Sequence, residues 1–178
     1  MHPSLVHLHN LRGEIGYKLV SMSSIDQLDA RIIEVMTEEP RIGVVEIARR
    51  LGVARGTVQS RLTKLTERGA ITGFGPEVEP PRIGYPVLAF VFLEIAQGRL
   101  SEAVKTIEGV PEVLEAYGTT GPRDLLCRVV ARDNEHLQEI INRILSTNAI
   151  RRSTSYIAMS RQIAPRTLPL VQAAARAE

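Results

Sequence analysis

The sequence predicts an α+β protein of two domains, with a helical first half and a second half in the order β-α-β-β-α-β. Three observations support this class. Apolar residues recur with the helical period between residues 25 and 71, whereas strand-like runs and helical faces alternate after residue 86. Between them lies PEVEPPRIGYP (76–86), whose four prolines disfavour both helix and central strand.

Length and composition fit two modest packed domains. The chain has 178 residues, of which 44% are hydrophobic, and its net charge is only +2. Its single cysteine, Cys127, excludes an internal disulfide framework and fits a reducing cytoplasm. Cys127 lies in the apolar run LLCRVV, so we favour a buried, inert thiol over a reactive one. No apolar run approaches the roughly 20 residues that span a bilayer, and we expect a cytoplasmic protein without a membrane partner.

The first helix is expected between residue 24 and Pro40. Ser24 with Gln27 three residues later has the spacing of a capping box. The residues that follow place one apolar face on this helix: Leu28, Ile32, Val35 and Met36.

The segment VVEIARRLGVARGTVQSRLTKLTERGAI (44–71) predicts a helix-turn-helix. Two helical patterns break at Gly52, where a turn requires the positive φ that glycine adopts easily. Ala48 is small where the helices approach, and Val58 fills the angle between them. Residues 69–74 are predicted to form a short hairpin wing. The whole is typical of a winged helix-turn-helix, whose second helix enters the major groove of DNA.

The distribution of positive charge supports a DNA-binding role, because basic residues are concentrated in the helix-turn-helix. Residues 49–68 hold six basic side chains against one acid. Arginine and glutamine read base edges, and hydroxyl and cationic groups bind phosphates. The alternative is a three-helix bundle with a merely solvated basic face. The candidate DNA-binding residues are Arg55, Thr57, Gln59, Ser60, Arg61, Lys64 and Arg68.

The second half has the element order of a ferredoxin-like βαββαβ domain. Its strands are expected over 87–95, 113–118, 125–131 and 153–159, with helical faces beginning near Leu100 and after Asp133, a plausible N-cap. We therefore divide the chain into an N-terminal extension (1–22), a winged helix-turn-helix (23–75), a linker (76–86), a ferredoxin-like effector-binding and oligomerisation domain (87–160) and a C-terminal tail (161–178). Whether the extension is flexible and the tail helical stays open.

With this order of domains and motifs, the chain resembles the Lrp/AsnC family of feast/famine regulators. IDQLDARII (25–33) is similar to the family's opening helix, and EPPRIGYP (79–86) to its hinge. GPRDLLCRV (121–129) resembles the effector loop and third strand. The resemblance implies an amino-acid-responsive regulator that dimerises through its C-terminal sheets and assembles further to tetramers or octamers. It also implies an effector bound between subunits, near the loop between the second and third strands.

The loop residues offer groups that suit an amino acid. Asp124 would receive the ammonium, and the backbone of residues 118–121 the carboxylate. Arg123, which departs from the family pattern together with Pro122, would pair with Asp124 or receive the carboxylate itself. The alternative is a plain hairpin turn in which Asp124 caps its own backbone. With hydroxyls from a neighbouring subunit, the candidate effector-binding residues are Gly118, Thr119, Thr120, Gly121, Pro122, Arg123, Asp124, Thr147, Ser153 and Ser155.

The expected function is sequence-specific, DNA-binding transcription regulation, modulated by an amino acid and associated with the nucleoid. Two alternatives remain: a ligand-independent DNA-architectural protein, and an enzyme like the sirohaem decarboxylases, which resemble this architecture. The enzyme is disfavoured because His136 is the only histidine of the second domain. No catalytic set, metal-binding motif or cofactor-binding motif stands out, so we expect neither catalysis nor a cofactor.

Overall fold

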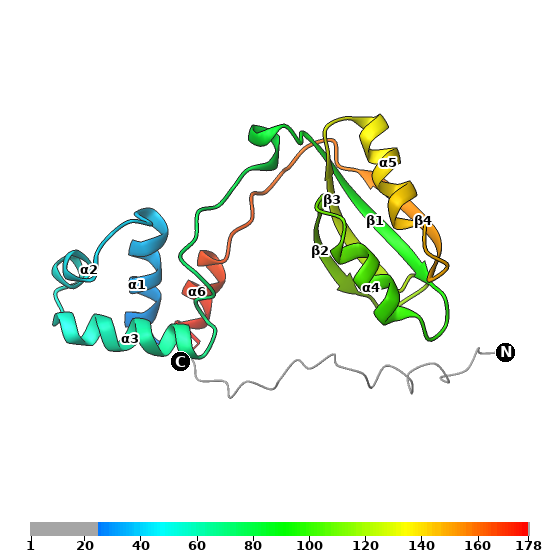
Figure 1. Ribbon diagram of the computed structural model, residues 1–178. Coiled ribbons are helices and arrows are strands. Elements are labelled where there is room, and N and C mark those ends of the chain that lie inside the picture. The colour runs from blue at the N-terminus through cyan, green and yellow to red at the C-terminus, as the bar shows by residue number, and fades with distance from the viewer. Residues whose placement is uncertain (1–24, 178) are drawn as a thin grey trace. The chain divides into compact units, whose positions relative to one another are not determined.

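The computed structural model describes residues 25–177, which fall into two compact units (Figure 1). Unit 1 comprises the described residues up to Gly75 together with those from Pro165 onward. Unit 2 is Pro76–Ala164. The chain therefore passes between the units twice, and the C-terminal residues belong to the same unit as the first helices.

Unit 1 contains the helix-turn-helix. Helices α1 (Gln27–Glu38), α2 (Val44–Leu51) and α3 (Arg55–Glu67) enclose an apolar cluster. The buried members of this cluster are Ile32, Ile47, Ala48, Val58 and Leu62. The periodicity read from the sequence thus corresponds to the faces that the three helices bury.

The turn between α2 and α3 depends on glycine. Gly52 has φ 67° and ψ 34°, in the left-handed region, and ends α2. The next amide, Val53 N–H, donates to the Ala48 carbonyl at 3.1 Å, which closes the last turn of the helix. Ala54 then begins α3 without a side-chain cap. The prediction for Gly52 is confirmed.

The start of α1 differs from the capping box expected at Ser24, which lies outside the described residues. Asp26 is the N-cap, and its carboxylate accepts from Asp29 N–H at 2.9 Å. Gln27 is consequently the first residue of the helix rather than its third. Asp26 was not considered in the sequence analysis, although aspartate is among the residues preferred as N-caps.

No strand forms over 69–74, so the wing expected there is an irregular loop. After α3, Gly69 has φ 72°, and the amides of Ala70 and Ile71 both donate to the Leu65 carbonyl. These amides point back at the helix and cannot pair with a second strand. Two further glycines, at 73 and 75, also lower the strand propensity of this loop.

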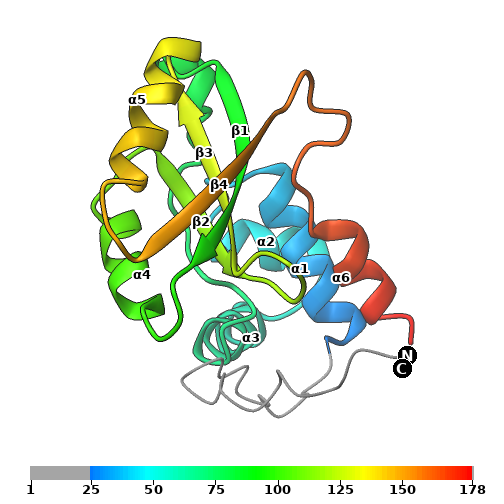
Figure 2. The ribbon, with the colours of Figure 1, turned by 90° about the vertical axis from the view of Figure 1, so that its right-hand side faces the viewer.

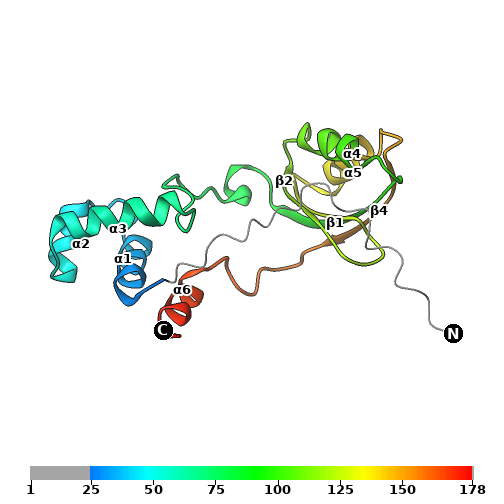
Figure 3. The ribbon, with the colours of Figure 1, turned by 90° about the horizontal axis from the view of Figure 1, so that it is seen from below.

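Unit 2 has the predicted βαββαβ order. The elements are β1 (Val87–Ile95), α4 (Leu100–Glu108), β2 (Val113–Gly118), β3 (Leu125–Ala131), α5 (Asn134–Ile144) and β4 (Ile150–Ile157). The sheet is antiparallel in the order β2-β3-β1-β4, which leaves β2 and β4 at its edges. Helices α4 and α5 cover the same face of the sheet (Figure 3).

The core of unit 2 lies between this sheet face and the two helices. On β1 the residues Ala89, Val91 and Leu93 are fully buried, and they alternate with Phe90 and Phe92 on the other face. Asp133 caps α5 as expected, accepting from His136 N–H at 2.7 Å.

Cys127, paired across the sheet with Val91, is also fully buried. Burial raises the pKa of its thiol to about 11, so Cys127 is the inert thiol that the sequence favours.

Two short elements lie outside the helix-turn-helix and the sheet. A 3₁₀ helix, η1 (Pro80–Ile83), precedes β1 within the segment expected to be a linker. Helix α6 (Leu168–Ala174) forms in the C-terminal tail. In the part of the chain that the structure describes, every helix is too short or too polar to cross a membrane.

Replacing Ile140 by alanine is expected to destabilise unit 2 by about 2–5 kcal/mol, because the side chain is fully buried on α5 and its loss leaves a cavity. The measurement is urea unfolding. The neighbouring Glu139→Ala variant, on the exposed side of the same helix, is the control and should stay within about 0.5 kcal/mol of the parent. Equal losses in both variants would contradict this placement of the core.

Candidate functional site

Helix α3 presents one face to the core of unit 1 and the other to solvent. Val58, Leu62 and Leu65 are buried. Five of the seven candidate DNA-binding residues are exposed along the rest of the helix: Arg55, Thr57, Gln59, Ser60 and Lys64. Thr63, which the sequence analysis passed over, is exposed as well, and its hydroxyl donates to the Gln59 carbonyl at 3.0 Å. Its position one turn after Gln59 was the signal that would have identified it.

The other two candidates, Arg61 and Arg68, contact α1. The carboxylate of Asp29 accepts from Arg61 Nη1 at 3.4 Å and from Arg68 Nη2 at 3.2 Å, and Asp26 pairs with Arg61 as well. Asp29 is only 4% exposed, whereas the side chains of Arg61 and Asp26 remain 36% and 38% exposed, so the cluster runs from a buried carboxylate to the surface. Both guanidinium groups therefore join α3 to α1.

The electrostatics of Asp26 fit this role. Partial burial by itself raises the pKa of the carboxyl, but the hydrogen bonds from Asp29 N–H and Arg61, with the nearby positive charge, lower it. The net direction is downward, so Asp26 stays ionised in the folded protein at neutral pH. Its charge, together with that of Asp29, balances the two arginines.

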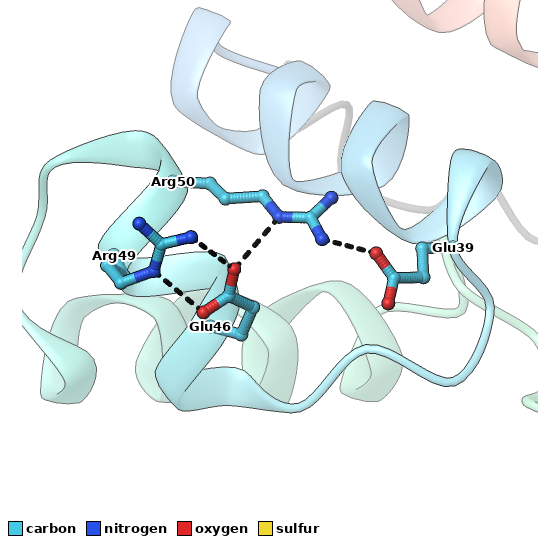
Figure 4. Close-up of polar contacts among 4 residues, drawn as sticks. All are labelled: Glu39, Glu46, Arg49 and Arg50. Carbon is cyan, nitrogen blue, oxygen red and sulfur yellow. Dashed lines mark hydrogen bonds and ion pairs between the residues drawn. The ribbon is translucent and has the colours of Figure 1, made fainter.

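A second group of ion pairs neutralises the basic end of α2 (Figure 4). Arg49 forks onto the Glu46 carboxylate, with nitrogen–oxygen distances of 2.8 and 2.6 Å. Arg50 bridges from Glu46, at 3.2 Å, to Glu39 just after α1. The hydrogen bonds from Arg49 and Arg50 lower the pKa of Glu46 to about 2. Glu46 therefore remains charged throughout the physiological range.

Four of the six basic residues between 49 and 68 are thus engaged with carboxylates of the same domain. Among the described residues, Arg55 and Lys64 make no ion pair, and both lie on the exposed face of α3. The charge available to a polyanion at this surface is smaller than the sequence count suggested.

An apolar groove of about 510 Å³ borders α3 in unit 1. Its walls come from the end of α1, the start of α2 and the side of α3 that carries Gln59 and Thr63, and Phe74 also lines it. The loop expected to be a wing therefore places an aromatic side chain beside α3. Within the described residues no cluster of three metal-binding side chains occurs.

The loop between β2 and β3 forms the second candidate site, and Asp124 organises it. The Asp124 carboxylate accepts from Ile95 N–H at 2.7 Å, and its own amide donates to the Leu93 carbonyl at 2.9 Å. Its carbonyl accepts from Thr119 N–H at 3.0 Å. Asp124 thus fastens the loop to the end of β1, rather than capping only its own turn.

Arg123 pairs with Glu94 of β1, not with Asp124. Arg123 Nη1 lies 3.1 Å from a Glu94 carboxylate oxygen, and Nη2 lies 3.5 Å from the Thr154 hydroxyl of β4. The side chains of this ion pair remain 28% and 35% exposed. The loop supports the arginine through Thr119, whose hydroxyl donates to the Arg123 carbonyl at 2.6 Å.

The other candidate effector-binding residues with hydroxyl groups do not lie beside the Arg123–Glu94 pair of their own chain. Ser153 and Ser155 lie opposite Leu93 and Val91, which places them on the helix-covered side of the sheet. Thr147 donates to Glu102 at 2.9 Å. Glu94 and Thr154, which the sequence analysis did not identify, take their place beside Arg123. Their signal was a strand alternation that sets them on the open sheet face, but the partner strand could not be read from the sequence.

Comparison with known proteins gives these two sites a common context. Residues 25–66 match the AsnC-type helix-turn-helix domain, and residues 88–168 match the Lrp/AsnC ligand binding domain. The chain belongs to the Lrp/AsnC family. The resemblance stated from the sequence is therefore confirmed, and so is the α+β fold class.

Related Lrp/AsnC regulators align with most of the chain. The chain is 33% identical to the HTH-type transcriptional regulator Ptr1 of Methanocaldococcus jannaschii over 117 residues, which cover 66% of this chain and 79% of that protein. It is 32% identical to the regulatory protein AsnC of Escherichia coli over 141 residues, or 78% of this chain and 93% of that protein. The function is accordingly transcription regulation by a helix-turn-helix protein.

Solved structures support the same fold. The structure of E. coli AsnC superposes with a TM-score of 0.76 at 31% identity, covering 82% of this chain and 99% of that one. A transcriptional regulator from Neisseria meningitidis, solved as an L-Met complex, superposes with a TM-score of 0.75 at 21% identity, covering 83% and 97%.

Replacing Asp29 by alanine is expected to destabilise unit 1 by about 3 kcal/mol, since two arginines lose a buried partner. Urea unfolding followed by a probe in unit 1 measures the loss. High salt should rescue little of it, because buried pairs are screened weakly. The control, Glu46→Ala, breaks exposed pairs and should shift the transition much less. Similar shifts in both variants would show that Asp29 does not join the helices.

Proposed function

We propose that this Lrp/AsnC regulator reads double-stranded DNA with the exposed face of α3, and that an amino acid bound at the loop of unit 2 modulates this binding. The observation that carries the DNA part is the distribution of cations. Arg55 and Lys64 face solvent on α3, whereas the arginines around them are held by carboxylates. We further propose a cytoplasmic, nucleoid-associated homodimer that assembles to tetramers or octamers, with no catalytic role and no cofactor.

The proposed interface combines charged side chains with neutral side chains that form hydrogen bonds. Lys64 and Arg55 supply phosphate contacts or, for the arginine, a bidentate contact to guanine. Thr57, Gln59 and Ser60 supply neutral donors and acceptors between them, of which glutamine suits adenine. Arg61 and Arg68 contribute by fixing the angle of α3, which decides whether these side chains reach the bases together.

The proposed effector site uses the Arg123–Glu94 pair. An α-amino acid carries a carboxylate that suits Arg123 and an ammonium that suits Glu94, so it replaces the pair without leaving either charge uncompensated. Thr120 and Gly121, whose amides make no hydrogen bond among the described residues, add backbone donors at the loop. Asp124, expected from the sequence to receive the ammonium, instead positions the loop in this proposal.

Two relationships support an amino acid as the effector: the match of unit 2 to a ligand binding domain and the L-Met complex of the structural relative. Thr147, Ser153 and Ser155 remain candidates only as groups that a neighbouring subunit would supply. A second candidate function is a ligand-independent DNA-architectural protein, which the internal satisfaction of Asp124, Arg123 and Thr147 favours.

Replacing Lys64 or Arg55 by alanine is expected to weaken DNA binding and to lower the slope of log K against log salt by about one for each lost phosphate contact. Fluorescence anisotropy titrations at several salt concentrations measure this. Arg61→Ala is the matched comparison on the same helix. It should lower the thermal stability of unit 1 because Asp26 and Asp29 lose their partner. A reduced slope in Arg61→Ala, with unchanged slopes in the other two variants, would reverse the assignment.

Screening the twenty amino acids by thermal shift tests the effector site. A ligand present at 100 times its Kd stabilises the folded state by about 2.7 kcal/mol, a readily measured shift. Arg123→Gln and Glu94→Gln should each abolish the shift given by the cognate amino acid. Arg151→Gln, an exposed cation on the neighbouring strand β4, is the control and should keep it.

Three outcomes of the screen are distinguishable. Loss of the shift in the Arg123 and Glu94 variants alone supports the proposed site. A shift that survives in both variants places the effector elsewhere. No shift with any amino acid, in a protein that binds DNA, favours the architectural function.

A further inference from the structure

The C-terminal helix α6 packs against α1 of the helix-turn-helix (Figure 2). The Gln172 amide donates to the Glu34 carboxylate of α1 at 2.8 Å, and Ala175 just after α6 is only 6% exposed. The residues of α6 that are at least half-buried, with the Ala175 that follows the helix, recur with the spacing of a single helical face: Leu168, Val171, Gln172 and Ala175. Between them Leu170 points outward and is 72% exposed.

The surface that α6 contacts is the back of α1. Helix α1 turns Ile32, Leu28, Val35 and Met36 toward the helix-turn-helix core. Ala30 and Ile33 are buried and half-buried without belonging to that cluster, and with Glu34 they lie on the opposite side of the helix. Without α6 this side of α1 would expose apolar surface.

The chain that leads to α6 is fastened where it leaves the sheet. After β4, Ala158 N–H donates to the Leu88 carbonyl at 2.8 Å. Arg161 then forks onto the carboxylate of Glu79, with distances of 3.0 and 3.3 Å, just before η1. Glu79 lies just after the first crossing between the units, and Arg161 lies just before the second. The ion pair therefore joins, within unit 2, the two segments of chain that lead from and to unit 1.

From these contacts we propose that α6 is a fourth helix of the DNA-binding unit, docked on the α1 of its own chain. Its docking makes residues 158–167 a second strap between the two units. One flexible connection leaves a domain free to reorient, whereas a second connection of limited length restricts that freedom. The strap thereby limits the motion of the recognition helix relative to the sheet domain, with or without an effector.

The docking is tested in the full chain by cross-linking with a short bismaleimide. The double variant Glu34→Cys/Gln172→Cys should give a cross-link within one chain, identified by mass spectrometry of the joined peptides. Val45→Cys/Gln172→Cys, with its first cysteine exposed on α2, is the control and should not. The native Cys127 reacts slowly, because it is buried and its thiol pKa is raised to about 11.

The strap is tested by the depolarisation of a dye on Val45→Cys. Adding Val171→Asp, on the docked face of α6, should increase the nanosecond depolarisation of the dye. The matched Leu170→Asp change, on the exposed face of the same helix, should leave it at the level of the parent. Neither readout requires DNA or an effector, so failure of the proposed function and failure of the strap are separate results.

Three results would overturn the proposal. Absence of the 34–172 cross-link would show that α6 is not docked on α1. A cross-link found only between chains would assign the docked helix to a second copy. Equal depolarisation of the parent and the Val171→Asp variant would show that docking does not restrain the domain.

Discussion

The buried carboxylate of Asp29 is the constraint on which the DNA-binding unit depends. It lies on α1 and pairs with Arg61 of α3 and with Arg68 just after α3, which adds directional contacts to the apolar packing of the helices. A single carboxylate facing two guanidinium groups would leave an uncompensated charge in a partly desolvated place. Asp26 supplies the second negative charge and caps α1 with the same side chain. The first turn of α1 therefore fixes both its own start and the orientation of the recognition helix.

Ion-pair clusters with no net charge reduce the number of cations that the DNA-binding unit can offer to phosphates. Asp26, Asp29, Arg61 and Arg68 balance one another, as do Glu39, Glu46, Arg49 and Arg50. At the proposed DNA interface, long-range attraction to phosphates would rest on the few cations outside these clusters, and few phosphate contacts are expected to give weak non-specific binding. Such a surface gains more from correctly placed hydrogen bonds than from charge, and placement is what the ion pairs between α1 and α3 provide.

The sequence predicted what depends on local pattern. Periodicity located the helices and strands, Gly52 marked the turn, and the element order identified the ferredoxin-like domain. It failed where partners lie far apart along the chain. Arg61 meets Asp26 and Arg68 meets Asp29 only once α1 and α3 have packed, so the sequence analysis interpreted both arginines as DNA contacts. The pair Glu46–Arg49, three residues apart on one helix, was within reach of sequence reasoning. The docking of α6 on α1 had no local signal at all.

The loop between β2 and β3 also shows that the role of a side chain depends on partners that are distant in the sequence. Asp124 looked like a free ligand group, yet its carboxylate satisfies the last amide of β1, where an unpaired N–H would be costly. The half-exposed pair is Arg123–Glu94 instead. A simple anion that displaced Glu94 from Arg123 would leave that carboxylate unpaired in a partly buried place, and a simple cation would do the same to Arg123. At the proposed site a zwitterion would compensate both charges at once, so we expect the pair to favour an amino acid over a lone acid or amine.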